Sequence, residues 1–301
     1  MPHGDVAKDR HAGQRVAVVG CGHVGVVTAA CLAELGQHVI GVDINEGLVN
    51  GLRAAHIPFI EPGLTELVVA NTALGRLSFT NSYQEALEDA EFVFLCVNTP
   101  STTTGAADLR YVRTAVTQIA DVLSASTNRP LIVNKSTSPI GTGETIEAIL
   151  GRTFAAGGSQ PGITANPEFL REGSAVHDFF HPERIVVGAD VAEDAERVAA
   201  LYDGIDAPVL LTDLRTAEMI KYVSNAFLAT RVSFINEIAR LCEYLGVDVD
   251  VVVRGVSLDS RIGGEFFKPG IGYGGSCLPK DVAALCHTGD SVGLAMRVLS
   301  S

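Results

Sequence analysis

The sequence predicts an α/β fold in which a doubly wound parallel sheet is followed by a helical segment. Three observations support this prediction. Short apolar, β-branched runs alternate with helical stretches as far as about Thr212, which is typical of βαβ units. A glycine-rich turn joins the first of these runs to the first helical stretch. Beyond Asp213 the alternation ends, and one long helical pattern takes its place.

Strands are expected where β-branched and other apolar residues cluster, and helices where apolar residues recur at helical spacing. Right-handed crossovers would place helices on both faces of the sheet. The expected strands are Val16–Val19, His38–Asp43, Phe92–Val97, Leu131–Asn134, Ile163–Ala165, Arg184–Val187 and Val209–Leu211. The expected helices are Val24–Leu35, Leu109–Leu123, Thr216–Leu245, Val249–Val256 and a last helix that begins near Lys280.

The same patterns divide the chain. Residues 1–14 are polar and lack the apolar core of a signal peptide, so a flexible N-terminal segment is expected there. Residues 15–210 are expected to form a Rossmann-like domain, and residues 211–301 a central helical domain. The long helix Thr216–Leu245 contains no proline or glycine and is followed by Gly246. Its many apolar positions, including Phe227, Phe234 and Ile238, predict that it forms a homodimer interface. The alternative is that these side chains pack against another domain of the complete protein.

Composition excludes several classes of protein. The net charge of −13 argues against a nucleic-acid partner, whose phosphates require a basic surface. No apolar run is long enough to span a bilayer, so no membrane partner is expected. The cysteines and histidines show no zinc-ligand spacing, and no metal site is predicted. Cysteines without a disulfide pattern favour a reducing, cytoplasmic setting.

The turn GCGHVG between the first strand and the first helix has the spacing of a dinucleotide fingerprint. In such a turn the glycines allow close approach of a pyrophosphate, and the helix N-terminus offers it free N–H groups. Asp43 ends the next strand, where a carboxylate binds a ribose 2′-OH and repels a 2′-phosphate, so NAD is the expected cofactor. The alternative is a glycine-rich turn with a capping aspartate, and it does not account for the strand, the helix and the spacing together. The residues expected at this site are Gly20, Gly22, His23, Val24, Gly25 and Asp43.

Polar residues follow two further strands. Thr99 and Thr137 come just after the expected strands Phe92–Val97 and Leu131–Asn134. Ligands of open α/β sheets bind at the carboxyl ends of the strands, so both threonines are placed to line the cofactor cleft. Ordinary loop polarity explains either residue alone equally well.

The segment NPEFLREG, residues 166–173, also follows a strand. Its carboxylates Glu168 and Glu172 could serve as a general base and a ligand contact. By spacing alone, a helix start with both carboxylates on a solvated face is the more common arrangement.

Two further motifs carry candidate chemistry. Lys221 and Asn225 lie one turn apart on the long helix, where a cation and an amide could stabilise an oxyanion; a solvated helix face is the commoner explanation. Cys277 follows a run of glycines and precedes Lys280 and Asp281. A nearby lysine favours the nucleophilic thiolate, and the alternative is one more buried thiol.

Taken together, these segments resemble the UDP-glucose/GDP-mannose dehydrogenase family. The Asp259–Gly263 segment and the long helix look more like the UDP-glucose members. The matching pieces, in the family's order, are GCGHVG, Glu61–Leu64, VNTPS with Asp108 and Leu109, KSTSPIGTG, NPEFLREG, AEMIKYVSNAFLA, Asn236 with Glu237, and GYGGSCLPKD.

The resemblance implies a four-electron oxidation of a nucleotide sugar, UDP-glucose to UDP-glucuronate, with two NAD+ per turnover. Cys277 would hold the aldehyde as a thiohemiacetal and then as a thioester, which water hydrolyses. Covalent capture suits this chemistry because the aldehyde must not escape between the two steps.

The resemblance also assigns roles to individual residues. Lys221 would stabilise oxyanions, and Asn225 would hold the substrate oxygen. Asp281 would order water, and Glu168 would act as a base or water activator, possibly with Thr137. The cofactor side would be met by Thr99, Glu172 and Lys280. The sugar nucleotide would be contacted by Phe169, Leu170, Lys221, Asn225, Phe266, Lys268, Tyr273 and Gly274, with Arg261 reaching it from a partner subunit.

The sequence departs from the family pattern in two places. Leu48 stands five residues after the acidic ribose-binding residue, where the family usually has Lys or Arg. The family also continues into a C-terminal nucleotide-sugar-binding domain, which is absent from these 301 residues.

Three alternatives remain from the sequence. A GDP-mannose dehydrogenase would give two NADH per sugar nucleotide, as a UDP-glucose enzyme would. A two-electron β-hydroxyacid dehydrogenase would give one, and it needs no thiol at Cys277. A truncated, non-catalytic NAD-binding form would give none.

Overall fold

The computed structural model describes residues 13–155 and 159–300. Most of the expected N-terminal segment 1–14 therefore lies outside the described residues. Contacts divide the chain into two compact units. The first comprises the chain up to Thr99 together with Leu109–Glu218, and the second comprises Pro100–Asp108 and the chain from Met219 onward. The domain boundary near residue 210 stays a prediction.

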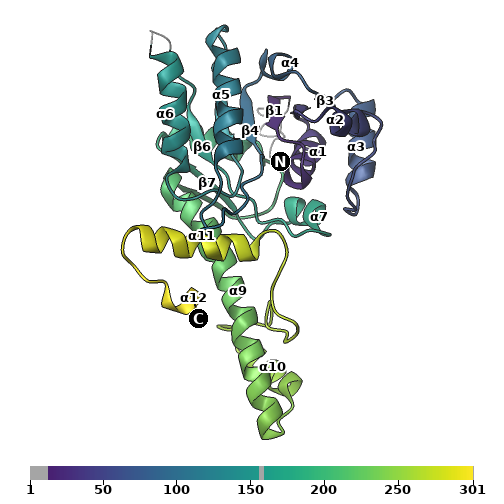
Figure 1. Ribbon diagram of the computed structural model, residues 1–301. Helices are drawn as coiled ribbons and strands as arrows, with labels where there is room; N and C mark the ends of the chain where they lie inside the picture. The colour runs from purple at the N-terminus through teal and green to yellow at the C-terminus, as the bar shows by residue number, and fades with distance from the viewer. Residues whose placement is uncertain (1–12, 156–158, 301) are drawn as a thin grey trace, which may run out of the picture. The chain divides into compact units, whose positions relative to one another are not determined.

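The first unit is built on one eight-stranded sheet (Figure 1), with the strand order β3-β2-β1-β4-β5-β6-β7-β8. All neighbouring strands are parallel except β6 and β7, which are antiparallel. The strands are β1 (Arg15–Val19), β2 (His38–Val42), β3 (Leu77–Thr80), β4 (Phe92–Leu95), β5 (Leu131–Asn134), β6 (Ile163–Ala165), β7 (Ile185–Ala189) and β8 (Val209–Thr212).

The prediction of a parallel sheet is thus confirmed for most strands and wrong for one pair. The β6–β7 connection leaves and re-enters the sheet at the same end, as the pairing of Ala165 with Gly188 requires. It therefore keeps the Asn166–Gly173 loop at the carboxyl end of β6. The edge strand β3, four residues long, was not predicted from the sequence. With only Leu77 and Phe79 apolar, β3 gives a weak signal.

Helices cover both faces of the sheet, as predicted. Successive residues of β1 point to opposite faces, so Val16 and Val18 join one apolar cluster while Ala17 and Val19 join the other. The first cluster includes side chains of α1, α2, α3, α7 and α8, and the second those of α4, α5 and α6. These helices are α1 (His23–Glu34), α2 (Glu46–Arg53), α3 (Leu64–Ala73), α4 (Tyr83–Leu87), α5 (Arg110–Ser124), α6 (Thr142–Phe154), α7 (Ala175–Phe180) and α8 (Ala192–Ala200).

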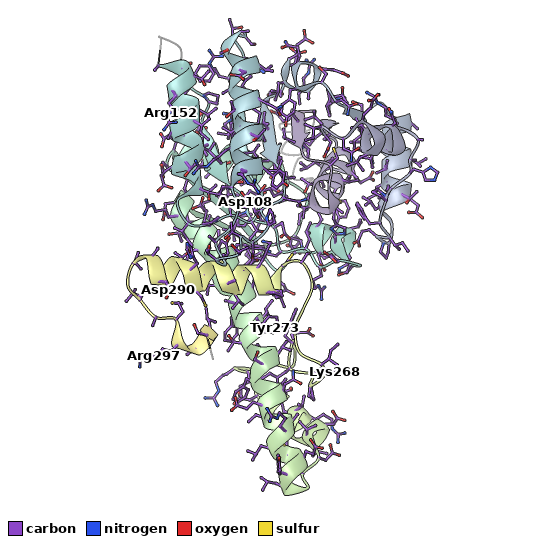
Figure 2. The ribbon with its side chains drawn as sticks, in the orientation of Figure 1. Asp108, Arg152, Lys268, Tyr273, Asp290 and Arg297 are labelled. Atoms are coloured by element: carbon purple, nitrogen blue, oxygen red, sulfur yellow. The ribbon has the colours of Figure 1, made fainter. Side chains whose placement is uncertain are left out.

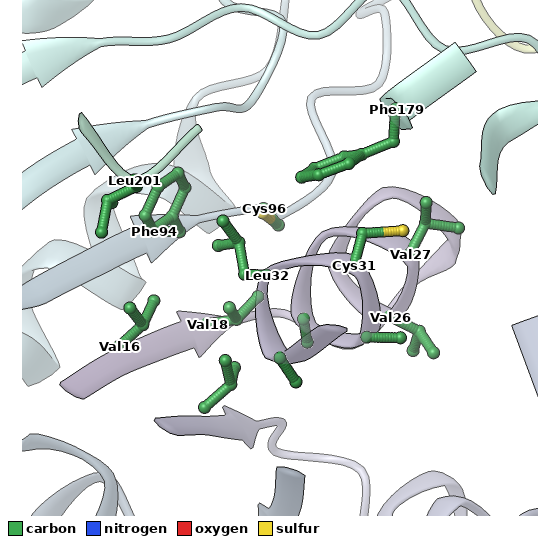
Figure 3. Close-up of a cluster of buried hydrophobic side chains, with 14 of the residues drawn as sticks. Val16, Val18, Val26, Val27, Cys31, Leu32, Phe94, Cys96, Phe179 and Leu201 are labelled. Carbon is green, nitrogen blue, oxygen red and sulfur yellow. The ribbon is translucent and has the colours of Figure 1, made fainter. Parts of the chain in front are cut away.

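Four of the six cysteines are buried and all six are free. Figure 3 shows Cys31 and Cys96 among the apolar side chains of the first cluster. Burial is the main cause that raises the pKa of the Cys96 thiol to about 12, and it raises the pKa of Cys31 further. These thiols therefore behave as neutral, apolar packing groups.

The second unit is helical. Its helices are most of α9 (Leu214–Leu245), α10 (Val249–Ser257), α11 (Leu278–Ser291) and α12 (Arg297–Ser300). The long helix is confirmed: α9 runs for 32 residues without a break, and Gly246 follows it with a φ of +67°. That left-handed conformation suits glycine and ends a helix.

One side of α9 is apolar and exposed. Val223 is 50% exposed, Phe227 60%, Phe234 51% and Leu241 54%. Spacings of four, seven and seven residues place these side chains along one stripe of the helix. Ile238, which the sequence also suggested for this face, is half-buried.

Within residues 13–155 and 159–300, no helix combines the length and apolarity needed to cross a bilayer. The same residues contain no group of three or more His, Cys, Asp or Glu side chains placed to bind a metal.

Candidate functional site

The glycine-rich turn after β1 has the geometry of an anion cradle. Gly20 has a φ of +94°, and a Cβ there would lie 2.8 Å from the Cys96 carbonyl oxygen. A Cβ on Gly25 would lie 1.8 Å from the Gly20 carbonyl oxygen, so helix and turn are packed as closely as glycine permits. Gly22, by contrast, has no atom within 4 Å of its Cβ position. The turn is thus tight on its inner side and open at Gly22.

The N-terminus of α1 opens onto this turn. Gly22 is its N-cap and provides no side-chain cap, and the first turn carries no acidic residue. His23 and Val24 are its first two residues, so their N–H groups are among those that an α-helix leaves without an intrahelical partner. The helix dipole favours negative charge at this point. The residues present therefore fit the pyrophosphate of a dinucleotide.

Asp43 follows β2 beside the same turn. Its Oδ2 accepts a hydrogen bond of 2.8 Å from the Cys21 N–H, and its Oδ1 one of 2.9 Å from the Asn45 N–H. The residue is half-exposed. Burial, and then the negative charge of Asp43, raise the pKa of the Tyr83 phenol to about 12. The Asp43 carboxylate is therefore held directly against the glycine-rich turn by the N–H of Cys21.

Thr99 and Thr137 lie together at the carboxyl ends of β4 and β5. The Thr99 hydroxyl donates a hydrogen bond to the Thr137 carbonyl oxygen. Thr99 is buried and Thr137 is half-buried. The structure brings the two loops together at the sheet edge that also carries the glycine-rich turn, because β1, β4 and β5 are parallel neighbours.

Glu168 does not sit on a solvated helix face, and that interpretation is wrong. Residues 166–171 have no helical structure, and Glu168 is only 6% exposed. Its Oε2 accepts a hydrogen bond of 2.7 Å from the Leu170 N–H. Phe169 lies under the Arg184 guanidinium, 4.0 Å from the ring centroid, whereas Glu172 is exposed. The loop thus holds one carboxylate inside and presents the other to solvent.

A buried lysine, Lys135, holds together the loops that follow β5 and β6 at the points where they leave the sheet. Lys135 is 4% exposed. Its Nζ donates hydrogen bonds of 3.0 Å to Asn166 Oδ1 and 3.2 Å to the Tyr202 hydroxyl. It therefore joins the loop after β5 to the loop after β6. Lys135 was not among the predicted site residues, because its place directly after an apolar strand does not distinguish a buried, paired lysine from an exposed one.

The second unit brings together three of its predicted site residues. Asp281 is fully buried. Its Oδ2 accepts a 2.6 Å hydrogen bond from Asn225 Nδ2, and its Oδ1 lies 2.6 Å from Lys280 Nζ. Lys221, one turn before Asn225 on α9, is 4% exposed. The solvated-face interpretation of Lys221 and Asn225 is therefore wrong.

Cys277 is the N-cap residue of α11 and is half-buried. Its carbonyl oxygen accepts the Asp281 N–H at 3.0 Å, and its Sγ lies 3.6 Å from Ser276 Oγ. It is not the fully buried thiol of the alternative interpretation. The Lys280 ammonium, expected to support a thiolate, forms its ion pair with Asp281.

Apart from Lys221 and Asn225 of α9, the expected sugar-nucleotide residues of the second unit lie on the loop between α10 and α11. Figure 2 labels Lys268 and Tyr273 there. Arg231 of α9 holds this loop with hydrogen bonds of 2.9 Å and 2.8 Å to the Ile262 and Gly263 carbonyl oxygens. Arg261 is exposed and pairs with Asp259 at 2.7 Å. Phe266 is half-buried with a φ of +56°, and Gly274 is exposed.

The predicted site residues thus fall into two sets, one in each unit. The first unit carries Gly20, Gly22, His23, Val24, Gly25, Asp43, Thr99, Thr137, Glu168, Phe169, Leu170 and Glu172. The second carries Lys221, Asn225, Arg261, Phe266, Lys268, Tyr273, Gly274, Cys277, Lys280 and Asp281.

Two buried carboxylates of the first unit were missed as structural anchors. Glu218 accepts hydrogen bonds of 2.7 Å and 2.8 Å from the Gly141 and Gly143 N–H groups, at the start of α6. Burial raises its pKa to about 7 despite these two bonds. Glu61 accepts three hydrogen bonds in a similar way. Neither role can be read from spacing, because each joins segments far apart in the sequence.

Comparisons with known proteins agree with this geometry. The UDP-glucose/GDP-mannose dehydrogenase family's NAD binding domain matches residues 14–206, and its central domain matches residues 215–301. The chain therefore carries an NAD-binding domain.

Individual relatives are named as members of the same family. UDP-glucose 6-dehydrogenase TuaD of Bacillus subtilis is 44% identical over 96% of this chain. The chain spans 62% of the length of TuaD, and thus less than two thirds of it. UDP-glucose 6-dehydrogenase of Rhizobium meliloti is 43% identical over 95% of this chain and 66% of its own length.

A solved UDP-glucose dehydrogenase from Pyrobaculum islandicum superposes with a TM-score of 0.93 at 42% identity, covering 97% of this chain and 67% of that one. A GDP-mannose dehydrogenase from Pseudomonas aeruginosa gives 0.80 at 33% identity, covering 96% and 67%. Both matched domains and the arrangement of the glycine-rich turn lead to one conclusion: the chain belongs to the UDP-glucose/GDP-mannose dehydrogenase family of oxidoreductases.

Proposed function

We propose that this protein oxidises the C6 alcohol of UDP-glucose to the carboxylate of UDP-glucuronate. The observation that carries the proposal is the cluster that Asn225 of α9 forms with Lys280 and Asp281 in the first turn of α11, the helix that begins beside Cys277. The relatives named UDP-glucose 6-dehydrogenase support UDP-glucose over GDP-mannose as substrate, at 44% and 43% identity against 33%.

NAD+ supplies the hydride acceptor in both oxidation steps. Glu168, acting directly or through water, would take the proton from the C6 hydroxyl in the first step. The Cys277 thiolate would then add to the aldehyde carbon, and Lys221 would stabilise the oxyanion that forms. After the second loss of hydride leaves a thioester, water ordered by Asp281 would attack it. The tetrahedral intermediate would then collapse with cleavage of the C–S bond, which expels the Cys277 thiolate and leaves the sugar carboxylate as product, while the protons of the attacking water pass to solvent.

The stoichiometry tests this proposal directly. Incubating the protein with a limiting amount of UDP-glucose and excess NAD+ should give two NADH per sugar, measured at the absorbance of NADH. A yield of one would indicate the two-electron alternative. Two NADH from GDP-mannose and none from UDP-glucose would reverse the choice of substrate.

The similarity to a 3-hydroxyisobutyrate dehydrogenase structure, at 17% identity and a TM-score of 0.64, concerns the fold alone.

The cofactor preference gives a first prediction. We expect NAD+ to bind at least ~100-fold more tightly than NADP+, because the Asp43 carboxylate would face the 2′-phosphate across a short distance. Isothermal titration with each dinucleotide measures the ratio. Asp43→Asn keeps the size of the side chain and removes its charge, so it should reduce the difference in affinity between NAD+ and NADP+. Equal affinity of the wild-type protein for both cofactors would show that Asp43 does not face the ribose.

The exposed stripe of α9 gives a second prediction. Two copies packed through Val223, Phe227, Phe234 and Leu241 would remove apolar side chains from water, which favours association. We expect a homodimer at micromolar concentration in light scattering. Phe227→Glu combined with Phe234→Glu should give monomers that still bind NAD+. A wild-type monomer would contradict this prediction.

Substrate affinity gives a third prediction. The chain spans 62% of the length of TuaD, and remote binding energy positions the reacting part of a substrate. Without further contacts to the uridine, we expect these 301 residues to bind UDP-glucose weakly, since losing several hydrogen bonds of about 1 kcal/mol each lowers affinity by orders of magnitude. Calorimetry measures this affinity. Micromolar binding would show that the residues present hold the nucleotide by themselves.

A further inference from the structure

Glu61 is a buried carboxylate that joins separate segments of the first unit. It lies between α2 and α3, and its side chain is 0% exposed. Its Oε2 accepts hydrogen bonds from His23 Nε2 at 2.9 Å and from the Gly173 N–H at 2.9 Å. Its Oε1 accepts the Ala175 N–H at 2.8 Å. A buried carboxylate is costly unless donors satisfy it, so these three groups determine its position.

One end of this network is the dinucleotide-binding turn. His23 is the first residue of α1 and directly follows the open position at Gly22. Its ring packs against Phe59, with the ring centroids 4.7 Å apart. The backbone of His23 therefore lies where the pyrophosphate is expected, while its side chain is fixed by Glu61.

The other end is the segment that closes the Asn166–Gly173 loop. Gly173 has a φ of +88°, and Ala175 begins α7. A second anchor holds the same segment, because Asp178 accepts the Arg171 N–H at 2.9 Å and Arg171 Nε at 3.0 Å. The hydrogen bonds between Asp178 and Arg171 stay within this segment, whereas those of Glu61 join it to His23 at the glycine-rich turn.

We propose that Glu61 is a positioning residue that couples the dinucleotide-binding turn to the loop carrying Glu168 and Glu172. A single oxygen, Oε2, accepts from both His23 and Gly173. If binding of a dinucleotide at the N-terminus of α1 displaces His23, the displacement is transmitted to Gly173 through Oε2 of Glu61, because both residues are hydrogen-bonded to this atom. A dinucleotide held at α1 thus steadies the loop that carries the base of the reaction; this part of the inference rests on the proposed function.

Amide hydrogen exchange in the free protein tests the link without cofactor or turnover. His23→Leu keeps the apolar contact with Phe59 but removes the donor to Glu61. We expect the amides of Gly173 and Ala175 to exchange about tenfold faster in this variant. His23→Gln retains an N–H donor and should restore slow exchange. The Leu170 amide, which is bonded to Glu168, serves as the internal reference and should not change.

A second arm uses NAD+. In the wild-type protein NAD+ should slow exchange at Gly173 and Ala175, and in Glu61→Gln, which cannot serve all three donors, this response should be lost. Asp178→Asn is the matched control, since it loosens the Arg171 anchor and should leave the response to NAD+ in place. If Glu61→Gln does not fold, as judged by circular dichroism, the His23 variants decide alone.

The outcomes separate the two claims. Unchanged exchange of Gly173 and Ala175 in His23→Leu overturns the link, as does a response to NAD+ that persists in folded Glu61→Gln. Failure of the wild-type protein to bind NAD+ overturns the proposed function instead. In that case, amide exchange of the cofactor-free His23 variants still tests whether Glu61 links the two loops.

Discussion

Replacing Gly25 by alanine should destabilise the protein strongly, although alanine is the better helix former. Helix propensity alone would favour the change by about 1 kcal/mol. The new Cβ, however, would lie 1.8 Å from the Gly20 carbonyl oxygen and 3.3 Å from the Cys96 Cβ. Relief requires α1 to move away from the sheet. We expect a net loss of about 3 kcal/mol or more, and a melting temperature lower by roughly 5–10 °C.

Gly22→Ala is the matched control for this substitution. Gly22 has a φ of −71° that alanine adopts readily, and nothing lies within 4 Å of its Cβ position. This variant should melt like the wild-type protein but bind NAD+ at least ~10-fold more weakly, because the methyl group occupies the space of the pyrophosphate. Thermal melts and NAD+ titrations of both variants separate packing from binding. Equal stability of Gly25→Ala and Gly22→Ala would refute the close packing.

Cys277→Ser should abolish oxidation of UDP-glucose beyond the aldehyde level. Serine is a far weaker nucleophile at neutral pH unless a base activates it, so we expect turnover to fall by about 1,000-fold or more. NAD+ binding should remain, because its predicted contacts lie mainly in the first unit. In the wild-type protein, peptide mapping by mass spectrometry after addition of UDP-glucose and NAD+ would detect the sugar adduct on the peptide that contains Cys277, and the Cys277→Ser variant should lack it.

Cys286→Ser provides the comparison. Cys286 is the other half-buried cysteine, nine residues further along on the same helix α11, and its Sγ lies 3.8 Å from Ser300 Oγ. This variant should keep the wild-type NADH yield and the adduct. Full NADH production by Cys277→Ser would exclude the covalent route while leaving the assignment to the family intact.

The sequence predicts best where chemistry depends on local spacing. The turn Gly20–Gly25 could be predicted because each of its glycines meets a backbone requirement of dinucleotide-binding turns, namely a tight turn, close approach of the pyrophosphate or close helix packing. Asp43 could be predicted because it comes at the end of the next strand. The length of α9 was equally accessible, because no glycine or proline interrupts its pattern. The run of glycines before Cys277 and the nearby Lys280 made this thiol a candidate from local sequence, and the family resemblance added the roles of Asn225 and Asp281.

Predictions were weaker where burial or long-range pairing decides the outcome. Spacing favours a solvated face for Glu168, Lys221 and Asn225, yet all three are buried. A pattern of residue types does not show which polar group finds a partner across the fold. The reversal of β7 and the three bonds of Glu61 were inaccessible for the same reason, since each joins segments that are distant along the chain.

The buried cysteines have a practical consequence for measuring stability. Alkylating reagents attack thiolates, and burial raises the pKa of Cys96 to about 12 and also raises that of Cys21. In the folded protein these thiols are therefore both shielded and protonated, and iodoacetamide can reach them only when the sheet opens. Their rate of alkylation measures how often it opens. The first unit thus contains its own probes of unfolding, and no engineered label is needed.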